Sequence, residues 1–148
     1  MSKAQASYAE QIVKYFDKHP DAGVDLTVEE VLADMDVWTS RHRVHKNGGT
    51  WLDDAARAAV EAEIMRLKAG IEPLRIAAQR AGDYLRLHGR TIDETARETA
   101  RQEARDTRVA YAEAGRAAAA AVRGLAERYG DQHHDEIAEI ATRKGVLR

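Results

Sequence analysis

Two long stretches of apolar residues at helical spacing constrain the fold of this chain more than any other feature. In residues 51–88, apolar side chains recur at steps of four and three, at Val60, Ile64, Leu67, Ile71, Leu74, Ala78, Ala81 and Leu85. In residues 92–129 the corresponding positions are mostly alanine, at Ile92, Ala96, Ala100, Ala104, Tyr111, Ala114, Ala118, Val122, Leu125 and Tyr129. Because this spacing places each set on one helix face, each stretch predicts a long amphipathic helix.

The short segment between the two stretches determines how they are arranged. Only the sequence HGRT, at 88–91, joins them, and such a short connection requires an antiparallel reversal. The first stripe keeps its register through Gly70 and Pro73, which favours one kinked helix, with a break at Gly70 as the alternative. We therefore predict a long antiparallel helical hairpin with a seam of small side chains, which lets the two helices approach closely.

The flanking segments are expected to complete a single all-α domain over residues 1–148, an elongated bundle with small helices at both termini. Residues 1–47 are expected to form a two-helix segment packed on the hairpin, 50–130, and residues 131–148 a C-terminal helix. Patterns that cap helix starts support this division, and they begin at Ser7, Thr27, Thr50 and Thr91.

The second N-terminal helix is open to two interpretations. Its apolar residues keep helical spacing from Val28 to Trp38, so it either continues to Lys46 or breaks near Asp36. Trp38 belongs to the apolar face of this helix, and we assign it to the core.

Composition excludes several classes of protein. The chain contains no cysteine, which excludes disulfide scaffolds, thiolate metal sites and cysteine nucleophiles. It has no apolar run of the ~20 residues that cross a bilayer, and its first residues lack the apolar core of a signal peptide. We therefore expect a cytoplasmic protein without a membrane partner. Its abundance of alanine and arginine is typical of phage or high-GC bacterial proteins.

A basic segment near the end of the second helix is the first candidate site. The stretch ADMDVWTSRHRV, at 33–44, resembles the second and third helices of a phage-repressor-type helix-turn-helix. It departs from that motif at Leu32, Asp36 and His42, where the motif has a small residue, a glycine and a branched apolar residue. The resemblance implies duplex DNA binding by the basic and hydroxyl side chains of residues 39–46, namely Thr39, Ser40, Arg41, Arg43, His45 and Lys46.

The same cations have a simpler interpretation, which we favour. In the last turns of one long helix, they would complement the carbonyl end of the helix dipole. The overall formal charge is −2, and residues 75–128 hold only eleven basic against eight acidic side chains. A protein that binds a polyanion needs a stronger excess, because neutralising phosphates supplies most of the non-specific affinity. DNA binding is therefore the alternative hypothesis.

Other polar clusters do not make complete chemical sites. His42 with His45, and Asp131 with His134, have ligand-like spacing, but neither pair supplies the three or four ligands that zinc needs. Phosphate-binding glycine loops and nucleophile motifs are missing as well. We predict no metal, no cofactor, no small-molecule substrate and no enzymatic activity. A ladder of arginines is expected either to neutralise nearby acids or to contact a partner, at Arg97, Arg101, Arg105 and Arg108.

These observations favour a non-enzymatic helical binding or regulatory protein, such as an adaptor, an inhibitor or an assembly factor. It would act through contacts with a protein partner. Because a two-helix hairpin buries little surface, we also expect a homo-oligomer. Trp and Arg dominate the energetics of protein interfaces, so the expected protein-binding residues are Trp51, Arg41 and Arg43.

Overall fold

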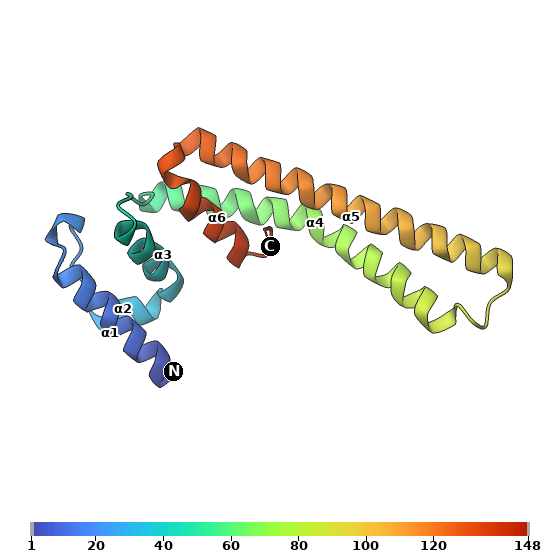
Figure 1. The fold of residues 1–148 in the computed structure, drawn as a ribbon, viewed down its shortest axis with the longest axis horizontal. Coiled ribbons are helices and arrows are strands. Elements are labelled where there is room, and N and C mark those ends of the chain that lie inside the picture. Colours follow the sequence, from blue (N-terminus) through green and yellow to red (C-terminus); the bar gives the residue numbers. More distant parts are fainter. Residues whose placement is uncertain (1, 148) are drawn as a thin grey trace.

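The computed structural model describes residues 2–147, and over this range the chain forms α-helices and two short 3-10 turns, with no β-strand (Figure 1). The helices are α1 (Lys3–Asp17), α2 (Val28–Ala33), α3 (Met35–Lys46), α4 (Asp54–His88), α5 (Glu94–Tyr129) and α6 (His134–Arg143). The 3-10 turns are Pro20–Ala22 and Asp131–His133. The predicted all-α fold is confirmed.

Helices α4 and α5 form the predicted antiparallel hairpin and lie side by side along its length (Figure 1). Each has about 35 residues and is therefore ~52 Å long. Aspartate side chains cap both N-termini, Asp53 accepting from the amide of Ala56 at 2.7 Å and Asp93 from that of Ala96 at 2.8 Å. Asp93, rather than the predicted Thr91, is the cap of α5 because its carboxylate reaches the orphan amides of the first turn.

Helix α4 runs without interruption through Pro73, as the unbroken register predicts. Proline lacks an amide donor and its ring crowds the preceding turn, so it bends a helix without always ending it. Figure 1 shows α4 changing direction near its middle, where this residue lies. The alternative of a turn at Gly70 is wrong, because that residue is helical.

The half of the hairpin farther from the α4–α5 turn, which we call the proximal half, contains the larger apolar core. Helix α6 folds back onto both hairpin helices there and supplies a third wall. The buried members of this core are Leu52, Val60, Ile64, Ala118, Val122, Leu125, Ala126, Ile137, Ile140, Ala141 and Val146. Three helices therefore shield this part of the seam from water.

The N-terminal segment differs from the predicted pair of helices. It contains three, because the chain breaks between α2 and α3 at Asp34, whose φ of −143° and ψ of 58° lie outside the helical region. This break falls two residues before the predicted position at Asp36. The cap of α1 lies five residues before the predicted cap at Ser7, because Ser2 and Gln5 form a reciprocal capping box.

The N-terminal helices enclose a second apolar cluster. Its buried members are Ala9, Ile12, Phe16, Leu26 and Val31, with Trp38 and Trp51 packed against them. Trp38, assigned to the core, packs against this cluster and is itself half-buried. This segment makes its principal helix contact with the rest of the chain through α3 against α6, and it also contacts Trp51 and Asp54 at the start of the hairpin.

The remaining part of the hairpin, residues 72–110, projects away from both cores, and we call it the distal arm (Figure 1). In this arm, α4 and α5 pack only against each other. Within the arm, Ala100 is the sole buried residue. The rest of the seam stays half-exposed, because two helices alone shield each other on one side only.

Candidate interaction surface

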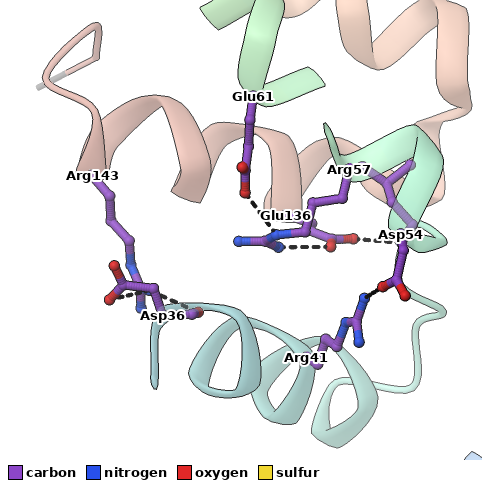
Figure 2. Close-up of polar contacts among 8 residues, drawn as sticks. Asp36, Arg41, Asp54, Arg57, Glu61, Glu136 and Arg143 are labelled. Carbon is purple, nitrogen blue, oxygen red and sulfur yellow. Dashed lines mark hydrogen bonds and ion pairs between the residues drawn. The ribbon is translucent and has the colours of Figure 1, made fainter. Parts of the chain in front are cut away.

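Arg41, a predicted binding residue, lies inside the junction between the N-terminal helices and the hairpin. Its Nη2 donates to Oδ1 of Asp54 in the first turn of α4, at 2.5 Å (Figure 2). Its guanidinium also lies over the rings of Trp38 and Trp51, at 5.0 and 5.8 Å from their centroids. Arg41 is only 8% exposed, so it connects two parts of the same chain and offers no surface to a partner.

A buried ion pair fixes α6 to the start of α4. Glu136 accepts from Arg57 Nη1 at 3.1 Å and from the backbone amide of Leu52 at 2.8 Å, and Arg57 also donates to Glu61 at 3.0 Å (Figure 2). Both oxygens of the Glu136 carboxylate are satisfied, which offsets the cost of burying its charge. This pair is structural, because its members are enclosed by the core.

Arg143 closes the opposite side of the same junction. Its Nη1 donates to the backbone carbonyl of Asp36 at 2.8 Å and lies 3.0 Å from that residue's carboxylate (Figure 2). Its Nη2 lies 2.7 Å from Glu139, which also lies 3.5 Å from Arg43. The start and the end of α3 are therefore both held to α6 by charge.

The residues predicted to read DNA do not form one exposed surface. Of the six, Thr39, Ser40 and Arg41 are buried between helices, and His45 is half-buried and hydrogen-bonded within the chain. Arg43 and Lys46 are exposed. A break in the chain is present, as the resemblance requires, but the helix after it presents its central residues to the interior. In this conformation most of the expected DNA contacts cannot reach a groove.

Trp51 is also less exposed than we predicted. It was expected on the surface, but it is half-buried and packs edge-on against Phe16 with ring centroids 6.0 Å apart. Of the three predicted protein-binding residues, only Arg43 is exposed. The sequence pattern could not reveal this, because the packing partners of residues 41 and 51 come from a separate part of the chain.

Histidines and a tyrosine form a polar cluster between α1 and α3. The hydroxyl of Tyr15 lies 2.7 Å from His45 Nδ1, and His45 Nε2 lies 2.9 Å from Asp21. His19 stacks on Tyr15 at 4.1 Å, and His42 packs edge-on against it at 4.5 Å. Burial, reinforced by the negative charge of Asp21, raises the pKa of Tyr15, so this chain of hydrogen bonds does not supply a reactive phenolate at neutral pH.

Large exposed apolar side chains are found on the hairpin. Within residues 2–147 they are Met65, Tyr84, Leu87 and Val109, with exposed fractions of 45, 49, 62 and 52%. All but Met65 belong to the distal arm. These side chains do not belong to the apolar stripes that the periodicity identifies. The sequence could have indicated them only as apolar residues on the helix faces opposite those stripes.

The charges of the distal arm are nearly balanced, and several of them pair with each other. The arm contains eight basic and seven acidic side chains. Of the arginine ladder, Arg97 pairs with Glu94 at 2.7 Å, while Arg101 and Arg105 both pair with Glu98, at 3.6 and 3.3 Å. Arg97 also donates to the turn carbonyls of Gly89 and Ile92. The arm thus presents mixed charges to a partner and no strong field of one sign.

The described residues offer no metal-binding group of three or more His, Asp or Glu side chains. Among the helices that the structure describes, none has the length and apolarity needed to cross a membrane. Comparisons with protein-family models, curated proteins and solved structures give no significant match. The distal arm is the most distinctive part of the surface that the structure describes.

Proposed function

We propose that this protein is a non-enzymatic binding or regulatory protein, an adaptor, inhibitor or assembly factor that holds a protein partner with the distal arm of its hairpin. The observation that carries the proposal is the incomplete shielding of that arm. Two helices cover each other there without a third, while three large apolar side chains are exposed: Tyr84, Leu87 and Val109.

Physical reasoning favours a protein partner over the alternatives. Large apolar side chains that are exposed lose contact with water when a partner covers them, which favours binding by ~25 cal/mol per Å² of apolar area. The nearly neutral, self-paired charges of the arm do not supply the excess of cations that drives nucleic-acid binding. The contacts of Arg41 and Glu136 join the N-terminal helices and α6 to the start of α4.

The experiment places a photo-crosslinking amino acid on the arm of the full-length protein in its host cell. We expect crosslinks to discrete proteins, or to a second copy, from Tyr84 or Val109. The matched control is Ala58, which is exposed on the proximal half of α4. If the arm positions give no adduct beyond those obtained from Ala58, the proposal is wrong. Mass spectrometry of the adducts distinguishes a different protein from a second copy.

A further inference from the structure

The outward-facing side of α4 carries a stripe whose residues are symmetric about Ile76, and we call it the outer stripe. Its members share one helix face because they follow each other at steps of four and three. They are Met65, Ala69, Glu72, Ile76, Arg80, Asp83 and Leu87. They lie opposite the buried seam of the same helix, and none of them is buried.

For two of the three residue pairs about Ile76, the symmetry is chemical as well as positional. Four residues before Ile76 stands Glu72, and four residues after it stands Arg80. Eleven residues before it stands Met65, and eleven after it Leu87, two of the large exposed apolar side chains. With the two-fold axis at Ile76, a helix placed antiparallel to its own copy therefore sets Glu72 against Arg80 and Met65 against Leu87. The remaining pair, Ala69 and Asp83, is not chemically matched, and Asp83 pairs with Arg86 of its own helix.

We propose that the outer stripe is the interface of a two-fold antiparallel dimer, in which α4 of one copy packs along α4 of the other. This inference rests on the proposed function and names a second copy as the partner of α4, both in the arm and at Met65 and Ala69 just before it. In a two-fold interface, residue i contacts residue j of the copy and j contacts i. Met65 would then pack against Leu87, Glu72 would pair with Arg80, and Ile76 would meet itself.

The charges at the stripe are available for these contacts. Both contacts that Arg75 makes with Glu72 go to Oε1, so Oε2 has no partner among the described residues. Arg80 is exposed, and the described part of the chain supplies it with no ion pair. A partner of unrelated sequence gives no reason for opposite charges at equal distances from one residue, whereas a second copy does.

The size of the interface sets the strength that we expect. Met65 and Leu87 are 22 positions apart in one helix, and the contact would be ~33 Å long. One helix pair of this length buries less than the ~1,600 Å² of a standard interface. The dimer should therefore be weak, and its formation should depend on protein concentration.

Because the chain contains no cysteine, single introduced cysteines report the register directly. A short bis-maleimide should crosslink Ile76→Cys to itself. It should join Met65→Cys to Leu87→Cys when the two variants are mixed, and join neither variant efficiently to itself. Ala120→Cys is the matched control, because Ala120 is exposed on α5 and lies outside both the arm and the stripe. Crosslinking of Ala120→Cys as efficiently as Ile76→Cys would overturn the proposal.

A charge exchange tests the same register without a crosslinker. Glu72→Arg should raise the dissociation constant about tenfold in sedimentation equilibrium, because the introduced guanidinium faces that of Arg80 across the interface. The double variant Glu72→Arg, Arg80→Glu should restore the dimer, since the pair is then reversed. Failure of the double variant to restore a dimer that the single variant has lost contradicts the pairing.

The outcomes separate this inference from the proposed function. If the purified protein remains a monomer and Ile76→Cys does not crosslink, the dimer is refuted. The proposed function still holds in that case when Tyr84 or Val109 captures a different protein in the cell. If the arm captures nothing and the protein is monomeric, both are refuted.

Discussion

The carboxylate of Glu136 on α6 lies 3.1 Å from the guanidinium of Arg57 on α4, and both side chains are buried. The two residues are far apart in the sequence, and their contact joins the C-terminal helix to the base of the hairpin. Leu52, whose amide donates to the same carboxylate, brings the segment before α4 into this contact. One buried ion pair therefore lies at the centre of the contacts that join α6 to the start of α4.

Removing one member of this pair should destabilise the protein strongly. Glu136→Ala leaves Arg57 buried without its main partner, and such losses cost ~3–5 kcal/mol in the free energy of unfolding. Urea denaturation monitored by circular dichroism measures the change. Glu61→Ala is the matched control, because Glu61 contacts the same arginine from the surface and should cost under ~1 kcal/mol. Equal effects from the two variants would contradict the structural role given to Glu136.

Arg41 and Arg43 should respond differently to the same substitution. Arg41→Ala removes a buried guanidinium from between two tryptophans and from Asp54, and we expect a loss of about 2 kcal/mol in stability. Arg43→Ala should change stability by less than ~0.5 kcal/mol, because its side chain is exposed. Thermal unfolding compares the two variants. Similar unfolding temperatures for both would place Arg41 on the surface, as the DNA-binding hypothesis requires.

The stability of the N-terminal helices should decrease in mild acid. Burial, reinforced by the nearby cations Lys46 and Arg43, lowers the pKa of His42 below its ordinary 6.5. As pH falls through 6.5, the unfolded chain takes up this proton before the folded one does, so the free energy of unfolding falls. His19 and His45 lie close enough to oppose protonation further.

The measurement is denaturation at several pH values from about 7.5 to 5.5, where carboxylates remain ionised. His42→Gln removes the titrating group and should flatten the decrease. His134→Gln is the control, because His134 is exposed at the start of α6 and should leave the decrease unchanged. An identical decrease in the His42→Gln variant would show that another group causes it.

Arg97 should determine the order of the hairpin tip. It donates to the carbonyls of Gly89 at 2.6 Å and Ile92 at 3.2 Å, and so satisfies the turn that joins α4 to α5. In Arg97→Ala, amide hydrogen exchange around residues 85–92 should accelerate about tenfold, with little change in the two cores. Arg101→Ala is the control, since Arg101 pairs only with Glu98 in the described structure. Unchanged exchange at the tip would contradict this role.

Much of the hairpin could be predicted from the sequence because its determinants are local. Steps of four and three along residues 60–85 require a helix with one apolar face, and that register passes through Pro73 without a shift. A connection of only four residues between the two long helices permits no arrangement other than an antiparallel one. Boundaries were less certain, because Asp93 and Thr91 both suit a cap, and the choice depends on which side chain reaches the first-turn amides.

The candidate site was harder to predict, because it depends on contacts between distant segments. Arg41 and Trp51 belong to types common at interfaces, and their sequence neighbours do not reveal that each contacts the other inside the molecule. The exposure of Leu87 and Val109 depends on the absence of a third helix over the distal arm. Periodicity identifies the face that a helix buries, and it does not identify how many neighbours cover the remaining faces.

By itself, then, the sequence determined an all-helical chain and an antiparallel pair of long helices, since helix formation and a short reversal follow from nearby residues. The tertiary structure decided the rest. The central residues of α3 face the interior, α6 ends halfway along the hairpin, and no third helix packs on the distal arm in the described part of the chain. The physical reason is that burial depends on every segment that packs around a residue, and those segments are far apart along the chain.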